Sequence, residues 1–326
     1  MASLRLTELI LHIGWQVVGK PRKQSGEMAS LNYSELPVIC SGGTPLGGSI
    51  DRFRIVNMEI DMLLSRWFLW ITFHRCLWTI ALLLIISTGN SMAENATHKF
   101  KLVVLAEAGG IHRPFVDAAK VWLDKQAAGN SFSVDYIQDT DKIDDVFLSR
   151  YQVFIQLNYP PYGWTPTAMA AFTKYIEEGR GGWIGFHHAT LLGEFDGYPM
   201  WPWFSRFMGG IRFTDYIPKF ATATVVVEDP SHAVMKDVGQ TFVVDQEEWY
   251  TYDKSPRPNV HVLSRVDEAT YSPDTRTKMG DHPVVWTNEH YKARNVYIFM
   301  GHHPELFQNP AFTTIFRNSI LWAARQ

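Results

Sequence analysis

The sequence predicts an α/β fold, a three-layer sandwich in which a mostly parallel sheet lies between two layers of helices. Apolar runs typical of buried strands occur over 100–106, 131–137, 151–157 and 182–186, and helical or turn-rich segments separate them. Strands that alternate with helices favour a parallel sheet, because each crossover needs a connection of helix length. Such crossovers are right-handed, so we expect a flavodoxin-like or doubly wound arrangement.

The helices of this sandwich are indicated by apolar residues at helical spacing. In the first half of the predicted domain we expect them over 112–128, 141–148 and 165–178. The second half is richer in strands, and its closing segment, 309–324, has the pattern of an amphipathic helix. The strands expected in this half cover 221–228, 241–244, 260–266, 284–287 and 296–300.

An apolar stretch over 77–86 precedes the predicted fold and is typical of the core of a secretory signal. Basic residues come before it, and Ser91 and Ala93 are the small residues expected ahead of a cleavage site. This pattern predicts cleavage before Glu94 and a periplasmic or secreted protein, which meets the membrane only during export. The alternative is an uncleaved membrane anchor, although a run of this length is too short to cross a bilayer.

A signal peptide lies at the true N-terminus of a protein, so Met58 or Met62 is the expected start of the chain. The predicted organisation has three parts. They are a non-native or disordered leader over 1–57, a signal peptide or anchor over 58–93, and one domain over 94–326.

The composition of the expected domain excludes several kinds of chemistry. Cys40 and Cys76 are the only cysteines, and both precede the predicted cleavage site. The domain therefore has no thiol that could form a disulfide, attack a substrate or bind a metal. The net charge of −3 and the lack of a long basic run give no reason to expect a nucleic-acid partner. The sequence leaves the oligomeric state open.

The loops that follow the predicted strands are the expected place for a ligand. In open α/β sheets, ligands bind beyond the carboxyl ends of the strands. Four loops should therefore lie along one edge of the sheet, and they cover 107–113, 158–164, 187–190 and 301–304.

One of these loops has a pattern that brings a histidine to the edge of the sheet. The strand over 182–186 runs directly into Gly185-x-His187-x-Ala189. Small residues two positions before and after a central residue permit the tight strand-to-helix turn called a nucleophile elbow. This turn would project His187 above the sheet, where an imidazole can act as a general base or a metal ligand. The alternative is a histidine that only hydrogen-bonds within the turn.

A second pair of histidines follows the last predicted strand. His302 and His303 come directly after 296–300, and Pro304 favours a loop rather than a helix at this point. We expect both to reach the same edge as His187. The alternative is a pair of surface histidines without a shared task.

A group of acidic and aromatic residues follows the apolar strand over 241–244. If the strand continues through this group, Glu248 and Tyr250 point to one face of the sheet and Glu247 to the other. The alternative is a solvated strand edge.

Several segments together resemble the ThuA-like (trehalose-utilisation) family. They include EEGRGGWIGFHHAT, QEEWYTYD and HPVVWTNEHYKARNVYIFMGHH, and the resemblance covers 99–324. It implies a class I glutamine amidotransferase-like fold in which a histidine replaces the cysteine of the elbow. Glu247 stands where the family commonly has Asp. The residues that match the family pattern are His187, Glu248, Tyr250 and His302.

The string His303-Pro304-Glu305 invites an amidotransferase interpretation, because such enzymes carry His-Pro-Glu after a late strand. Glutamine hydrolysis of this kind proceeds through an acyl-enzyme, which requires a thiolate nucleophile. Since the expected domain has no cysteine, the sequence excludes this activity.

The resemblance instead implies a role in carbohydrate utilisation, with a disaccharide or a keto-sugar as the small ligand. We expect His187, His302, Glu248 and Tyr250 to be catalytic, through acid–base chemistry. The types of His187, His302 and Glu248 could also hold a divalent metal such as zinc, although no short spacing such as H-E-x-x-H supports this. The reaction class, a hydrolase, lyase or isomerase, is left open. A non-catalytic glycan-binding module of the same fold is the alternative.

Aromatic and imidazole rings of the same loops are candidates for contact with the sugar. Aromatic faces can pack against sugar rings, but such residues more often belong to a core. The expected substrate-binding residues are His112, His188, His303, Tyr162 and Trp164, and Trp201 and Trp203 are further candidates.

Overall fold

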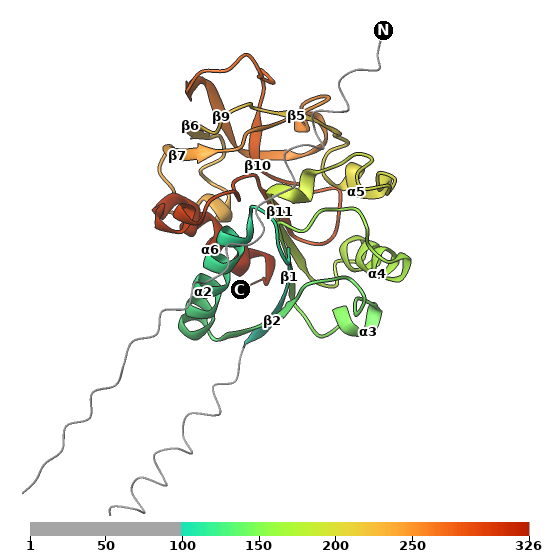
Figure 1. Ribbon diagram of the computed structural model, residues 1–326. Coiled ribbons are helices and arrows are strands. Elements are labelled where there is room, and N and C mark those ends of the chain that lie inside the picture. Colours follow the sequence, from blue (N-terminus) through green and yellow to red (C-terminus); the bar gives the residue numbers. More distant parts are fainter. Residues whose placement is uncertain (1–98, 326) are drawn as a thin grey trace, which may run out of the picture. The chain divides into compact units, whose positions relative to one another are not determined.

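The structure, a computed structural model, describes residues 99–325 of the chain. In this part of the chain, nine strands form the central sheet. Figure 1 shows this sheet with helices on both faces. The order of the strands is β2-β1-β3-β4-β11-β10-β9-β6-β7. Their bounds are β1 Phe100–Ala106, β2 Phe132–Ile137, β3 Val153–Leu157, β4 Gly182–Phe186, β6 Ala221–Val227, β7 Thr241–Glu247, β9 His261–Ser272, β10 Pro283–Thr287 and β11 Asn295–Ile298.

The sheet has a parallel part and an antiparallel part. Strands β2, β1, β3, β4 and β11 pair in parallel. Strands β10, β9, β6 and β7 continue the sheet through antiparallel pairs. The predicted α/β class with a large, mostly parallel central sheet is confirmed, and so is the strand-rich second half.

Helices cover both faces of the parallel part, as Figure 1 shows. Phe186 at the end of β4 packs on Phe316 of one helix layer, with ring centroids 4.7 Å apart. Trp183 of the same strand lies on the opposite face and packs on Phe207 at 5.0 Å. One layer contains α2 (Arg113–Asn130) and α6 (Pro310–Ala323), and the other contains α3 (Asp145–Leu148), α4 (Pro166–Glu177) and α5 (Pro202–Phe207).

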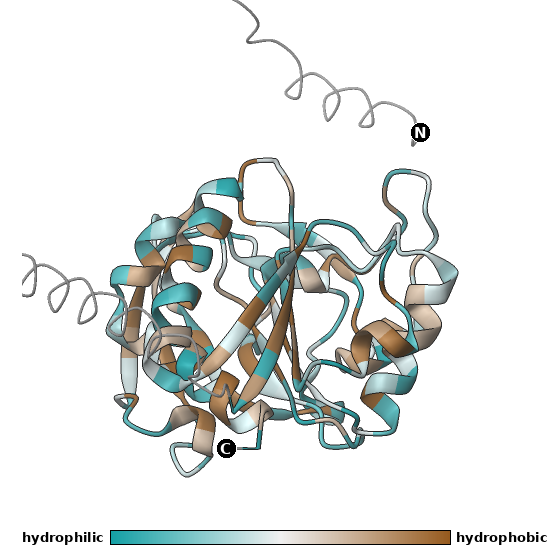
Figure 2. Ribbon diagram, turned by 90° about the horizontal axis from the view of Figure 1, so that it is seen from below, coloured by the Kyte–Doolittle hydropathy of each residue, from teal (hydrophilic) through white to brown (hydrophobic). Residues whose placement is uncertain are grey.

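The core lies between these layers, and every residue of β3 and of β4 is buried. Strands with helices on both faces read as continuous apolar runs, because neither face meets water. Figure 2 shows the apolar residues on the central strands and on the helix surfaces beside them. The apolar runs in the sequence therefore located the parallel strands well.

Capping side chains set the starts of three of the four predicted helices, and α2 has none. The Thr165 side chain accepts a hydrogen bond from the backbone N–H of Ala168, and Asn309 caps α6 in the same way. The helix expected over 141–148 begins only at Asp145, because the Asp144 side chain accepts from the N–H of Phe147. The prediction was therefore too long at its N-terminal end.

Three short elements were not predicted from the sequence. They are α5 and a separate two-stranded antiparallel sheet, which consists of β5 (Phe213–Tyr216) and β8 (Tyr250–Tyr252). The strand expected over 241–244 does not continue through Glu248 and Tyr250, so the condition for their shared face is not met. Strand β7 ends at Glu247, directly after Gln246 adopts a positive φ of 50°, and β8 begins at Tyr250. A backbone in this left-handed region cannot continue a regular strand.

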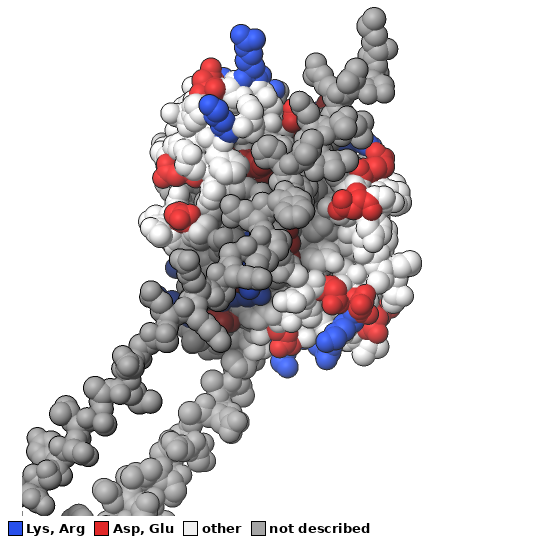
Figure 3. All heavy atoms as spheres, viewed as in Figure 1, with Lys and Arg blue, Asp and Glu red and all other residues white. Residues whose placement is uncertain are grey.

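The segments predicted as leader and signal peptide lie outside the described residues. Both segments, and the export that they imply, stay predictions. Within residues 99–325, no helix combines the length and apolarity that crossing a membrane requires. Figure 3 shows the described acidic and basic side chains of one face interspersed rather than gathered by sign. The expected lack of a nucleic-acid partner also stays a prediction.

Replacement of Phe172 by Ala tests the packing of the α4 layer. The Phe172 side chain is fully buried among the rings of Phe154, Trp164 and Phe204. We expect Phe172→Ala to lower the free energy of unfolding by about 3–5 kcal/mol, because the ring's contacts are lost and a cavity is left in its place. Urea unfolding followed by circular dichroism measures the change.

The matched control is Val121→Ala on α2, where the side chain is 74% exposed. This variant should stay within about 0.5 kcal/mol of the parent. Equal stability of the two variants would contradict the described packing.

Candidate functional site

The predicted tight turn after β4 is present and begins at His187. This residue has a positive φ of 34°, and a single 3₁₀ turn, His187–Thr190, follows it. The hydroxyl groups of Thr190 and Tyr297 both donate hydrogen bonds to the backbone carbonyl of His187, at 3.0 Å each. The imidazole itself bonds outside the turn, with Nδ1 3.2 Å from the carbonyl oxygen of Phe299. The alternative of a histidine bonded only within its own turn is therefore excluded.

The expected meeting of the loops at one edge of the sheet is also observed. The Asn158 side chain donates a hydrogen bond to the carbonyl oxygen of Gly301 at 2.6 Å. His188 Nδ1 in turn bonds to the backbone carbonyl of Asn158 at 3.1 Å. A Cβ atom at Gly301 would lie 2.7 Å from the Cβ of His187, so only glycine permits this approach.

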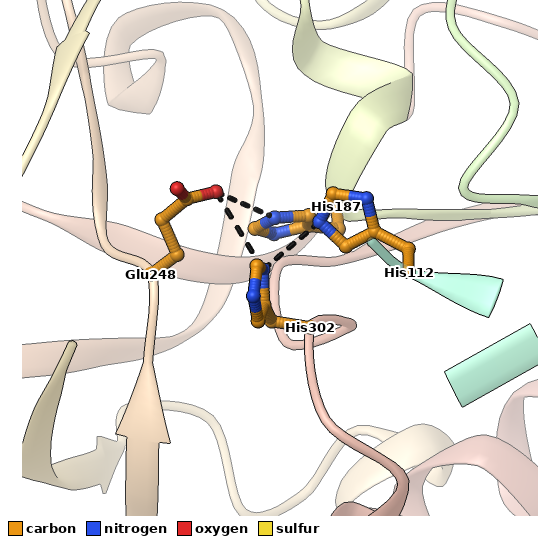
Figure 4. Close-up of side chains that lie close together, drawn as sticks. All are labelled: His112, His187, Glu248 and His302. Atoms are coloured by element: carbon orange, nitrogen blue, oxygen red, sulfur yellow. Dashed lines mark hydrogen bonds and ion pairs between the residues drawn. The ribbon is translucent and has the colours of Figure 1, made fainter. Parts of the chain in front are cut away.

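Four side chains from separate segments converge at this edge, as Figure 4 shows. His187 Nε2 lies 3.4 Å from Glu248 Oε2, and His302 Nδ1 lies 3.6 Å from the same oxygen. His112 Nε2 lies 2.9 Å from His302 Nδ1. One nitrogen or oxygen atom of each residue falls within 4.8 Å of the others, so the group has the size of a metal site. We call His112, His187, Glu248 and His302 the His–Glu cluster.

Burial controls the charge of the histidines in this cluster. It lowers the pKa of His187 and of His112 well below the usual value, and neighbouring imidazoles lower both further. Burial also lowers the pKa of His302, to about 4, although the Glu248 carboxylate opposes the shift. The three rings are therefore neutral at pH 7, a state in which a histidine can accept a proton or bind a cation.

Two residues next to Glu248 in the sequence also contact the elbow. The ring of Tyr250 lies 4.3 Å from that of His187, and burial together with the nearby Glu248 carboxylate raises the pKa of its hydroxyl well above the usual value. Glu247 is buried and accepts hydrogen bonds from the backbone N–H groups of Glu248 and Gly301. Burial raises the pKa of the Glu247 carboxyl group to about 8. The Tyr250 hydroxyl thus keeps its proton at neutral pH, and Glu247 links two of the loops.

The remaining predicted residues divide into those near the cluster and those in the core. His303 lies beside His302, and Phe220 contacts both rings at 5.0 and 4.4 Å. Tyr162 is half-buried. Burial, then Asp196 and then the charge of Glu107 raise the pKa of Tyr162 to about 12. Both therefore stay candidates for ligand contact.

Trp164 lies in the core instead. Its side chain is 5% exposed and packs on Phe154, Phe172 and Trp201, and its indole N–H donates to the carbonyl of Pro160. The predicted sugar-stacking role does not fit this position, because no face of the ring is free. Aromatic type alone could not distinguish a core residue from an exposed one.

Glu107, at the end of β1, was missed as an individual site residue. Its Oε2 lies 3.3 Å from His188 Nδ1 and 3.6 Å from His112 Nδ1. The sequence feature that could have identified Glu107 is an acidic residue directly after a buried strand, in a loop expected at the edge of the sheet. Its partner histidines could not be identified without the fold.

Comparisons with known proteins now define the class. The α/β fold matches that of a solved ThuA-like protein. A family model described as trehalose utilisation, ThuA, matches residues 101–323. The chain therefore belongs to the ThuA family, and this membership suggests a role in trehalose utilisation.

Solved structures include similar proteins. A protein from Bacteroides uniformis that is described as ThuA-like is 31% identical, with a TM-score of 0.61, over 69% of this chain and 91% of its own. A second, from Parabacteroides merdae, is 17% identical, with a TM-score of 0.47, over 69% of this chain and 90% of its own. No curated protein matches the chain.

Replacement of Gly301 by Ala tests the contact on which the site depends. The added Cβ would meet the His187 Cβ at 2.7 Å and Asn158 Oδ1 at 2.9 Å. We expect Gly301→Ala to lower the free energy of unfolding by about 1–3 kcal/mol, because the loops must move apart. Chemical denaturation measures the change.

Gly109→Ala is the matched control, since a Cβ there meets no atom within 4 Å. It should change the stability by no more than about 0.5 kcal/mol. A Gly301→Ala variant as stable as Gly109→Ala would show that the two loops do not approach as described.

Proposed function

We propose that this protein is an enzyme of carbohydrate utilisation that acts on a disaccharide or a keto-sugar at the His–Glu cluster. One observation carries the proposal. Neutral imidazoles and a carboxylate from distant segments converge at the carboxyl ends of parallel strands, where ligands bind in this fold class. The family description, trehalose utilisation, supports a sugar as the ligand.

The cluster and Tyr250 combine the groups that proton transfer to and from a sugar requires. Glu248, with 12% of its side chain exposed, is the most accessible member of the cluster and serves as the proton acceptor. Burial and the nearby Glu248 carboxylate raise the pKa of Tyr250, so it holds its proton at neutral pH, and its ring lies 4.3 Å from that of His187; it therefore serves as the donor. A keto-sugar suits this pair, since a base can remove the proton from the carbon beside the carbonyl while the acid protonates the carbonyl oxygen.

Glutamine hydrolysis is not proposed. The residue at the elbow is His187, and residues 94–326 contain no cysteine. An imidazole held by the Phe299 carbonyl cannot replace a thiolate in a stable acyl-enzyme. The predicted export would bring the enzyme to sugars outside the cytoplasm, and the apolar stretch over 77–86 supports it.

Replacement of Glu248 by Gln tests the proposed activity. Purified protein is incubated with a panel of disaccharides and their 3-keto derivatives, and products are followed by chromatography and mass spectrometry. We expect turnover of at least one compound. Glu248→Gln should lower kcat/KM by at least about 100-fold, because the amide cannot accept the proton.

Glu305→Gln is the control, because it makes the same substitution at an exposed position of the loop after His302. It should leave kcat/KM within about twofold of the parent. Binding of a sugar by the parent without turnover of any compound would contradict the enzyme and support the glycan-binding alternative.

A further inference from the structure

The elbow histidine presents a free lone pair to the carboxylate. The Phe299 carbonyl oxygen can only accept a hydrogen bond, so the proton of the His187 ring is on Nδ1. Nε2 is left with its lone pair, is buried and has no hydrogen-bond partner. It faces Glu248 Oε2 at 3.4 Å. A second ring proton would place a positive charge on a fully buried side chain, which burial disfavours.

The other two imidazoles add lone pairs to the same space. His112 Nε2 and His302 Nδ1 are 2.9 Å apart, and at most one proton fits between them. His302 Nδ1 also lies 3.6 Å from Glu248 Oε2. Three nitrogens and one carboxylate oxygen thus face one another with a single shared proton. A cation among these four atoms would give each lone pair a partner.

The distances fit a small divalent cation. Zinc bonds to imidazole nitrogen and carboxylate oxygen at about 2.0–2.2 Å, so the atoms of a tetrahedral ligand set lie about 3.3–3.5 Å apart. Three of the six distances among the four atoms are 2.9, 3.4 and 3.6 Å and lie on both sides of this value. All six are within 4.8 Å, so side-chain movements that draw the more distant pairs together would complete the ligand set.

We propose that His112, His187, Glu248 and His302 bind one divalent cation, and that zinc is the cation their ligand atoms suit best. The proposal adds His112 to the three ligands that the sequence suggested. It deepens the proposed function: with Glu248 Oε2 on the cation, Oε1 would remain to accept the proton, and the carbonyl of a keto-sugar would be polarised by joining as a fifth ligand. Cation binding is nevertheless measurable without any sugar.

Glu107 supports this assignment as a positioning residue. Its Oε2 lies 3.6 Å from His112 Nδ1, and neither atom has a hydrogen-bond partner. Histidines that bind metals commonly direct their other N–H group at a carboxylate, which fixes the tautomer. A proton on His112 Nδ1, facing Glu107, leaves Nε2 free for the cation.

A second cation beside Glu107 is not proposed, although Glu107, His112 and His188 also lie close together. His188 Nδ1 carries the proton that it donates to the carbonyl of Asn158. The nitrogen nearest to Glu107 therefore has no lone pair for a cation.

Zinc binding to the purified chain tests the proposal. The protein is treated with a chelator, dialysed and titrated with zinc chloride by calorimetry, and bound metal is counted by mass spectrometry. We expect one zinc per chain. His302→Ala should weaken binding by more than about 100-fold, since it removes a ligand, whereas the control His290→Ala, at an exposed position outside the cluster, should change it less than about threefold.

Glu107→Gln should weaken zinc binding by about 10–100-fold, with one zinc still bound at saturation. The unfolding temperature of its metal-free form should equal that of the parent, and Glu107→Asp should recover part of the affinity. A purely structural role for Glu107 would instead lower that unfolding temperature.

Two outcomes would overturn the proposal: a parent chain that binds no stoichiometric zinc, or equal affinity of His302→Ala and His290→Ala. Failure of the enzyme function is distinguishable from both. Stoichiometric zinc without turnover of any sugar would contradict the enzyme function and leave the metal site standing. Full turnover in the presence of a chelator would contradict a role of the metal in turnover and leave the enzyme function standing.

Discussion

The close contact of two loops, one after β4 and one after β11, is the constraint on which the site depends. These strands are neighbours and parallel, so both chains leave the sheet at the same edge. Gly301 has no side chain to hold the loops apart, and the Phe299 carbonyl and the Tyr297 hydroxyl fix the ring and the backbone of His187. His302 follows directly and meets the same carboxylate as His187.

The antiparallel part of the sheet supplies the acid of the site. Strand β7 ends at Glu247, and the chain then bends so that Glu248 reaches the parallel edge and Tyr250 enters β8. Phe213 of β5 packs edge-on against Tyr250, which in turn lies on His187. The small β5–β8 sheet therefore holds the acidic segment against the elbow. In this family member, the two parts of the sheet contribute different chemical groups to one place.

Much of this arrangement could be predicted from the sequence, and the reason is local. Apolar runs reveal buried strands, and Gly185 and Ala189 reveal the tight turn, because each depends on residues a few positions apart. Glu107 and the proposed ligand role of His112 could not be predicted, since they depend on contacts between distant segments. The end of the strand before Glu248 could not be located either, because the left-handed backbone of Gln246 has no clear signature in a non-glycine residue.

The contact between His112 and His302 joins residues 190 positions apart, near the two ends of the domain. Closing so long a chain segment has an entropic cost that the unfolded polypeptide avoids. A cation bound at this point, as proposed above, would therefore act as a staple between two segments that are far apart in the sequence.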